Sequence, residues 1–165
     1  MHESKQMTVD YGTLAKTILS LAEGETDAVA LMATLACEIH HADDRFDWTG
    51  FYRVTAPGML KIGPYQGGHG CLSIPFTRGV CGAAARSRTV QLVDDVEAFE
   101  GHIACASSTR SELVLPVFNA VGDVIAVLDI DSDKPAAFTQ DDANALEAIL
   151  FEVFAKQDSA ELAAT

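Results

Sequence analysis

The chain has 165 residues, 48% of them hydrophobic, which is enough for one hydrophobic core and too few for two ordinary domains. Its 24 acidic residues outnumber 11 lysines and arginines, so the formal net charge is −13 at pH 7. This charge argues against nucleic acid and anionic lipid as partners, because proteins bind both through lysine and arginine. We therefore expect one domain over residues 1–165, suited to a cationic or zwitterionic small ligand.

The sequence also indicates a compartment. It has no stretch of about eighteen apolar residues, the length that a transmembrane helix needs. Residues 1–16 mix charged and polar side chains where a secretory signal would be apolar. We expect a cytoplasmic protein without a membrane partner. Since thiols are kept reduced there, the four cysteines are expected to serve metal binding, redox chemistry or catalysis rather than a permanent disulfide framework.

Two helices are predicted over the first forty residues. The apolar positions of the first recur at helical spacing and are Leu14, Ile18 and Leu21. This helix ends at Gly24, and either Thr26 or Asp27 can cap the second. The apolar positions of the second are Val29, Met32, Leu35, Ala36 and Ile39. Cys37 falls within this apolar stretch and is expected to be a core residue, because free cysteine is often simply buried.

Strands dominate the middle of the chain. Aromatic and β-branched residues predict a strand over 46–54, and a turn at Pro57 and Gly58 leads to a partner strand over 59–63. The less regular chain that follows is predicted to contain a strand over 71–76, an Ala-rich helix over 79–88, a strand over 89–93 and a loop over 94–110. A loop of that length in a compact domain is usually either functional or disordered.

The last third predicts a hairpin followed by a helix. The strands cover 111–118 and 123–131, and Thr139 caps the closing helix. We expect an ordered core over about 10–156 and a frayed Ala-rich tail over 157–165. Helices, then strands, then a helix are typical of an α+β domain built on a central antiparallel sheet.

The hairpin brings acidic residues together. The predicted register pairs Phe118 with Asp123. Further pairs in this register are Glu112 with Asp129, Arg110 with Asp131, and Val114 with Val127. The acidic residues would share a face with Ile125 and Val127. Carboxylates opposed on a sheet destabilise it by up to about 1 kcal/mol, so they indicate a site for a cationic group. Alternatively, the strand ends splay into solvent or Arg110 neutralises the cluster.

Three cysteines, Cys71, Cys81 and Cys105, lie outside the strongly periodic segments. They form no CxxC pair, and a zinc site would have to recruit His69 or His102. Thiol chemistry fits better. Cys81 precedes the Ala-rich helix at its positive end, and Cys105 lies among polar residues that can hydrogen-bond a thiolate; a lowered pKa at either site would make a reactive thiol. Burial of each cysteine as a small apolar residue is the competing interpretation.

Four segments resemble one known family, the free methionine-(R)-sulfoxide reductases, which are single GAF-type domains. They are DWTGFY at 47–52, LKIGPYQGGHGCLSIPFTRGVCGAAA at 60–85, HIACASSTRSELVLPV at 102–117 and GDVIAVLDIDSD at 122–133. Many GAF domains share the last segment, and the three spaced cysteines narrow the resemblance to the reductases. It implies an antiparallel sheet with helices packed on one side and a loop-covered ligand pocket on the other.

This resemblance implies thiol-dependent reduction of free L-methionine-(R)-sulfoxide, with no cofactor and no metal. Cys105 would attack the sulfoxide sulfur and become a sulfenic acid. Cys71 would resolve it as a disulfide that thioredoxin reduces, and Cys81 would be an alternative or auxiliary resolving thiol. Trp48 and Tyr52 would surround the substrate. The residues implied to hold its amino group are Glu112, Asp129 and Asp131, in agreement with the hairpin argument.

The resemblance also implies a homodimer with the first and last helices in the interface. The principal alternative is a GAF module that binds a small ligand or senses oxidants without catalysis. We expect the enzyme instead, because sensor domains normally come fused to an output domain. A third interpretation, a structural zinc protein, predicts bound metal and loss of the fold on chelation.

Overall fold

The computed structural model describes residues 9–156. Its elements in chain order are α1 (Tyr11–Ala22), α2 (Ala28–His40), β1 (Trp48–Ala56), β2 (Met59–Gln66), β3 (Ser73–Pro75), α3 (Gly79–Ser87), β4 (Gln91–Val93), η1 (Val96–Ala98), β5 (Ser111–Phe118), β6 (Val124–Ser132), α4 (Gln140–Leu150) and η2 (Phe151–Ala155). The predicted tail over 157–165 lies outside the described residues. Within the described part of the chain, no helix is both long and apolar enough to cross a bilayer.

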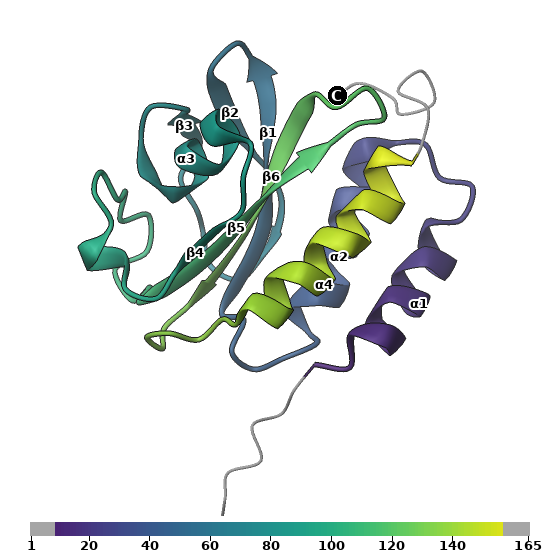
Figure 1. Ribbon diagram of the computed structural model, residues 1–165, viewed down its shortest axis with the longest axis horizontal. Coiled ribbons are helices and arrows are strands. Elements are labelled where there is room, and N and C mark those ends of the chain that lie inside the picture. Colours follow the sequence, from purple (N-terminus) through teal and green to yellow (C-terminus); the bar gives the residue numbers. More distant parts are fainter. Residues whose placement is uncertain (1–8, 157–165) are drawn as a thin grey trace, which may run out of the picture.

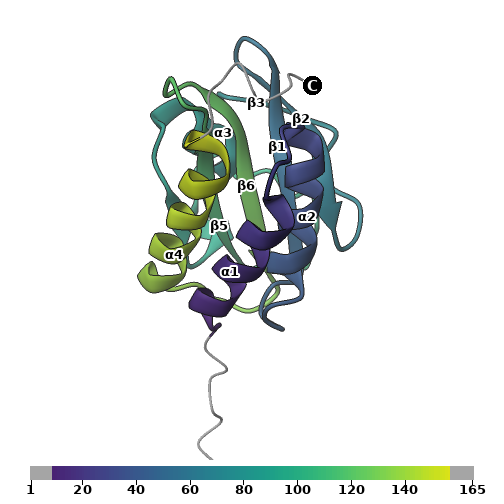
Figure 2. The ribbon, with the colours of Figure 1, turned by 90° about the vertical axis from the view of Figure 1, so that its right-hand side faces the viewer.

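One antiparallel sheet organises the molecule. Its six strands lie in the order β3-β2-β1-β6-β5-β4. Helices α1, α2 and α4 cover one face, whereas α3 and the loops beside it lie over the other (Figures 1 and 2). The α+β fold with helices packed on one side is therefore confirmed, and α3 is an additional cover on the side of the expected pocket.

The two faces of the sheet build two cores. Because side chains alternate along a strand, neighbouring residues of β5 and β6 enter different cores. The residues of these strands that pack under α1, α2 and α4 include Leu113, Leu115, Val117, Leu128 and Ile130. On the other face, Val114 and Val127 pack with Val80, Cys81 and Ala84 of α3. Cys81 is thus anchored against the sheet.

The helix ends follow the predicted capping residues. The Asp27 carboxylate accepts hydrogen bonds from the backbone N–H groups of Val29 and Ala30, and Thr139 forms a capping box with Asp142. In α1, Leu14 and Ile18 are buried as predicted. The prediction for Leu21 is wrong: it is 56% exposed, and the neighbouring Ala22 fills the core position.

The turn between β5 and β6 sets a different register from the predicted one. Asn119, rather than Phe118, pairs with Asp123, donating its N–H to the Asp123 carbonyl at 3.0 Å. Gly122 closes the turn with φ of 85°, a conformation that favours glycine. A bulge between the Val117 and Phe118 pairs adds a second shift. The loop moves the register by one residue and the bulge by one, two in all.

This shift changes the partners of the acidic residues and keeps them on one face. Glu112 pairs with Asp131, and Val114 with Asp129, so the predicted pairs of Glu112 with Asp129 and of Arg110 with Asp131 are wrong. A shift of two residues leaves alternate side chains on the same face, so the predicted acidic cluster survives. The same bulge turns Ile125 to the helix side, where it packs against that core instead of sharing the acidic face.

Candidate active site

A small cavity lies on the sheet face opposite α1, α2 and α4. Residues of β1, β3, α3, β5 and β6 line it, together with the loops before β3 and before β5. Its volume is about 30 Å³, which is room for about two water molecules. The cavity brings together all the predicted site residues except Cys71, which is bonded to Cys105 at its wall.

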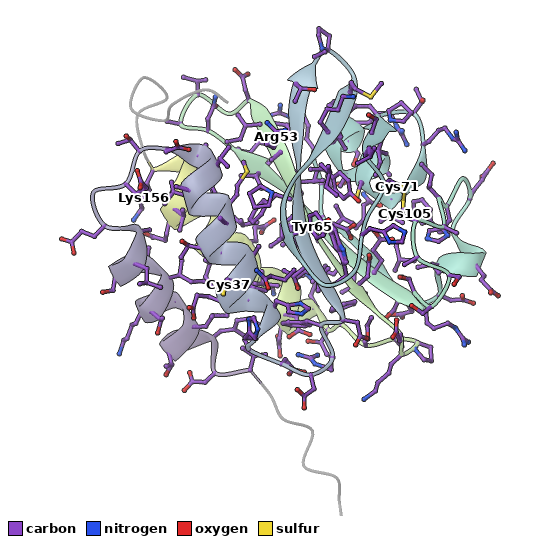
Figure 3. The ribbon with its side chains drawn as sticks, turned by 180° about the vertical axis from the view of Figure 1, so that it is seen from behind. Cys37, Arg53, Tyr65, Cys71, Cys105 and Lys156 are labelled. Atoms are coloured by element: carbon purple, nitrogen blue, oxygen red, sulfur yellow. A yellow bond between two sulfur atoms is a disulfide. The ribbon has the colours of Figure 1, made fainter. Side chains whose placement is uncertain are left out.

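Cys71 and Cys105 form a disulfide, as the resemblance implied. Their Cα atoms are 5.3 Å apart, although 34 residues separate them in sequence. Figure 3 shows the pair on the side of the sheet away from α1 and α2. Cys105 lines the cavity, and both residues are partly exposed. The structure thus presents an oxidised form whose disulfide lies between the cavity and solvent.

Cys81 is a free thiol buried in the first turn of α3. Its Sγ points at Glu112 Oε2 over 4.0 Å. Burial raises the pKa of this thiol well above its ordinary value, and the nearby carboxylates of Asp129 and Glu112 raise it further. The lowered pKa that a helix N-terminus can give a thiol is not found at Cys81, because desolvation and negative neighbours outweigh the helix dipole.

Three carboxyl groups form the inner wall of the cavity. Glu112 and Asp129 are only 6% and 4% exposed, and Asp131 is partly buried. Burial raises the pKa of each carboxyl group well above its ordinary value. The charges of the neighbouring carboxylates raise these three pKa values further. The Oδ1 atoms of Asp129 and Asp131 are buried without a hydrogen-bond partner. Such groups are costly unless something binds them.

No lysine or arginine of the described chain lines this cavity. His102 Nε2 lies 3.9 Å from Glu112 Oε1, but burial lowers the pKa of His102 below 6.5, so the imidazole is neutral at pH 7. The carboxyl cluster therefore lacks a protein cation. Its electrostatic complement is a positively charged ligand.

Aromatic residues close the other end of the cavity. Trp48 stacks between Tyr52 and Tyr65, with ring centroids 5.8 and 5.3 Å apart. Its indole Nε1 donates a hydrogen bond to the Gly68 carbonyl at 2.8 Å, tying β1 to the loop that carries Cys71. A Cβ at Gly70 would lie 2.9 Å from Tyr52 Oη, so only glycine allows the loop to pack this closely.

Several contributors were not predicted. Gly70, Ile103 and Thr109 line the cavity, and Tyr65 supports Trp48 from behind. Ile103 and Thr109 belong to the loop over 94–110, whose length was the one available signal. The remaining contributors depend on how the two loops fold over the sheet, which no local pattern encodes.

Cys37 lies outside the site. It is exposed on α2, on the opposite side of the sheet from the disulfide (Figure 3), and its Sγ is 3.9 Å from His41 Nδ1. The prediction that Cys37 is a core residue is wrong. The helix is apolar around most of its circumference, so the spacing of apolar residues did not identify its exposed side.

One donor set could hold a metal ion. The Sγ of Cys81 and carboxylate oxygens of Glu112 and Asp129 all lie within 4.8 Å of one another, and all three residues are buried. His69 and His102 line the cavity outside this set.

Comparisons with known proteins agree with this geometry. A GAF domain model matches residues 10–153. Free methionine-R-sulfoxide reductase of Escherichia coli is 37% identical over 140 residues, which cover 85% of this chain and 84% of that protein. The reduced form of fRMsr of Staphylococcus aureus matches with a TM-score of 0.86 and 36% identity, covering 95% of this chain and 97% of that one.

A second solved structure shows a related enzyme with substrate. It is free methionine-R-sulfoxide reductase from Neisseria meningitidis in complex with its substrate, with a TM-score of 0.81 and 40% identity. The match covers 87% of this chain and 85% of that one. The chain belongs to the GAF domain family and, within it, to the free methionine-R-sulfoxide reductases.

Proposed function

We propose that this protein reduces free L-methionine-(R)-sulfoxide to L-methionine. The observation that carries the proposal is the Cys71–Cys105 disulfide beside a cavity whose inner wall is a cluster of buried carboxyl groups without a protein cation. In the reduced form, the two thiols supply two electrons as they become the disulfide, and the carboxyl cluster suits the ammonium of a free amino acid. The relatives from Escherichia coli and Neisseria meningitidis, named for this activity, support the same assignment.

The reaction consists of two thiol steps. The Cys105 thiol attacks the sulfoxide sulfur, the oxygen atom passes to Cys105 as a sulfenic acid, and methionine leaves. The Cys71 thiol then attacks this sulfenic acid, releases water and forms the disulfide. Cys71 is the resolving thiol because its Cα lies 5.3 Å from that of Cys105, within the range of a disulfide. Cys81, a free thiol on the same cavity, is auxiliary.

The carboxyl cluster has two tasks. Glu112, Asp129 and Asp131 hold the substrate ammonium through charge-assisted hydrogen bonds. Because their pKa values are raised, the cluster also retains a proton that one carboxyl can donate to the sulfoxide oxygen as Cys105 attacks. Trp48 and Tyr52 enclose the apolar part of the substrate, including its methyl group.

The same cluster selects the free amino acid. A methionine sulfoxide inside a polypeptide has no α-ammonium, so its binding would leave the buried carboxyl groups uncompensated. The oxidised cavity, at about 30 Å³, is also too small for an amino acid. Substrate therefore enters the reduced form, once Cys71 and its glycine-rich loop are released from Cys105.

Thioredoxin is the proposed reductant, and the cytoplasm the proposed compartment, because thiols are regenerated there. Leu72, next to Cys71, is 74% exposed and offers an apolar contact to an approaching reductant. We also propose a homodimer. A groove along α1 and α4 is lined with apolar residues, among them Ala15, Leu19, Ala148 and Ile149, on the side of the molecule away from the disulfide.

A coupled assay tests the activity. The protein is mixed with thioredoxin, thioredoxin reductase and NADPH, and NADPH oxidation is followed after addition of free L-methionine-(R)-sulfoxide. We expect turnover with this substrate and none with the S epimer or with methionine sulfoxide inside a peptide. Binding of the free amino acid without turnover would instead favour a ligand-binding or redox-sensing GAF module. Equal rates with the peptide would contradict the role of the carboxyl cluster.

A further inference from the structure

The inner wall of the cavity contains a sulfur donor that the proposed cycle does not need. Cys81 Sγ and carboxylate oxygens of Glu112 and Asp129 lie within 4.8 Å of one another, with 4.0 Å between Sγ and Glu112 Oε2. An ammonium group engages the two carboxylates and gains little from a thiol. Binding of the substrate ammonium therefore does not explain why the Cys81 sulfur lies beside the carboxylate oxygens of Glu112 and Asp129.

A second observation points to a ligand at this place. Asp129 is 96% buried and lines the cavity, yet its Oδ1 has no hydrogen-bond partner. Buried polar atoms are normally satisfied, and an unsatisfied one costs about 1–3 kcal/mol. Among the described residues, no lysine or arginine lines the cavity. Asp129 thus has an unpaired oxygen in the wall of a cavity that it shares with Glu112 and Asp131.

The donor types favour a thiophilic divalent cation. Zn²⁺ accepts thiolate sulfur and carboxylate oxygen and, with three protein ligands, keeps a fourth position open. Hard cations such as Mg²⁺ and Ca²⁺ bind oxygen and avoid sulfur. Ligand atoms around a tetrahedral Zn²⁺ lie about 3.5 Å apart, so these donors, which lie within 4.8 Å of one another, need to approach by at most about 1.3 Å.

We propose that Cys81, Glu112 and Asp129 bind Zn²⁺, and that this ion inhibits the protein by occupying the place of the substrate ammonium. The metal-binding half of this inference stands on the donor set and on the unpaired oxygen of Asp129, and it does not depend on the proposed function. The inhibitory half rests on the proposed function. In this view Cys81 makes the acidic wall a metal site, because the carboxylates without sulfur would hold Zn²⁺ only weakly.

Zinc binding is best measured on the disulfide form of the full chain. In that form Cys71 and Cys105 are bonded to each other, so Cys81 and the exposed Cys37 are the free thiols. Calorimetric titration of this form with ZnCl₂ should show one ion per chain. Titration with Co²⁺ should add the absorption of a thiolate-to-metal charge transfer, which reports a sulfur ligand directly.

Variants locate the site. Cys81→Ala and Asp129→Asn should each weaken Zn²⁺ binding by more than about 100-fold, since even loss of an outer-shell partner costs about 10- to 100-fold. Cys37→Ser is the matched control, because it removes the other free thiol on the far side of the sheet, and it should bind Zn²⁺ as the unaltered protein does. Circular dichroism confirms the fold, and Cys81→Ser and Glu112→Gln replace any variant that does not fold.

Absence of a stoichiometric ion in the unaltered protein would overturn the inference. Retention of full affinity in the folded Cys81 variant, or loss of the charge-transfer band in Cys37→Ser, would overturn it as well.

Inhibition is measured in a single turnover. The protein is reduced, freed of reductant and given L-methionine-(R)-sulfoxide, and the methionine formed is quantified without thioredoxin. Methionine formation should fall in proportion to bound Zn²⁺ and recover with EDTA, and added L-methionine should weaken Zn²⁺ binding. Bound Zn²⁺ with undiminished methionine formation would overturn the inhibitory half. No methionine even in metal-free protein would contradict the proposed function and leave the zinc measurement standing.

Discussion

At the scale of single residues, the carboxyl cluster opposes the stability of the unliganded protein. The pKa values of Glu112, Asp129 and Asp131 are raised in the folded state by burial and by one another. A group with a raised folded pKa contributes stability below its ordinary pKa and loses that contribution as the pH rises through the raised value. The free energy of unfolding is therefore expected to fall above the ordinary values of 3.8 for Asp and 4.5 for Glu.

Replacing Asp129 should abolish turnover and raise the stability of the fold. Asp129→Asn removes a buried ionisable group, so the free energy of unfolding at pH 7 should rise by about 1–3 kcal/mol. The gain should vanish below pH 3.8, where the carboxyl is protonated in both states. Turnover should be lost, because the substrate ammonium loses a charged partner. Denaturant unfolding at both pH values measures this.

The exposed neighbour provides the control. Asp133→Asn removes an exposed carboxylate that is only a minor cause of the raised pKa of Asp131, so it should change stability and turnover far less than Asp129→Asn does. If Asp129→Asn were less stable than the parent at pH 7, the Asp129 carboxyl group would stabilise the fold, and the destabilisation attributed to it would be contradicted.

The place of a residue in the site was predictable only where the alternation of side chains along a strand determined which face of the sheet it lies on. Alternation along β5 and β6 placed Glu112 and Asp131 on one face even though the register was off by two residues. The exposure of Cys37 and the raised pKa of Cys81 were not predictable. Both depend on which neighbours surround the residue in the folded chain.

At the scale of elements, the loop between β2 and β3 is held over the site by Trp48. The indole donates to the Gly68 carbonyl, three residues before Cys71. The close approach at Gly70 adds shape complementarity. In the proposed cycle, this attachment positions Cys71 for disulfide formation after methionine has left.

Trp48→Phe should separate the two thiol steps. The variant keeps an aromatic ring and loses the hydrogen bond, worth about 0.5–1.5 kcal/mol, so disulfide formation from the sulfenic acid should slow by about two- to tenfold. Rapid quenching with a thiol-alkylating reagent follows this step independently of substrate affinity. Tyr65→Phe keeps the stacking and the hydrogen bond, and should form the disulfide at the parental rate. An unchanged rate in Trp48→Phe would remove the positioning role of Trp48.

The elements were predictable to a large extent, since helix caps at Asp27 and Thr139 and the alternation of the strands are local signals. The β5–β6 register was not. It depends on a turn that pairs Asn119 with Asp123 and on a bulge, and neither is specified by hydrophobic alternation. The packing of the loops before β3 and before β5 over the sheet likewise depends on tertiary contacts rather than on local sequence.

At the scale of the whole molecule, the sheet separates the candidate active site from the proposed dimer interface. The cavity and disulfide lie on the face of the sheet opposite α1, α2 and α4, whereas residues of α1 and α4 line the apolar groove. Figure 2 shows α1 and α4 together on their face of the sheet. Two copies joined through this groove would leave both cavities open to substrate and reductant.

A charge placed in the groove should therefore dissociate the dimer and spare catalysis. Leu19 is 39% exposed in the groove, so Leu19→Arg should shift sedimentation from dimer to monomer while turnover per chain stays constant. Leu21→Arg is the control, because Leu21 is also exposed on α1 and does not line the groove. A monomeric parent protein, or an equal effect of both substitutions, would contradict the proposed interface.

The most direct measurement is the methionine formed by Cys71→Ser in a single turnover without reductant. Cys105 should reduce one L-methionine-(R)-sulfoxide per chain and stop as a sulfenic acid that dimedone labels at Cys105, because Cys71 is absent and the raised pKa of the buried Cys81 thiol makes it a poor nucleophile. Cys105→Ser should form no methionine. Absence of methionine from Cys71→Ser, or a dimedone label on Cys81 instead of Cys105, would contradict the assignment of the attacking thiol.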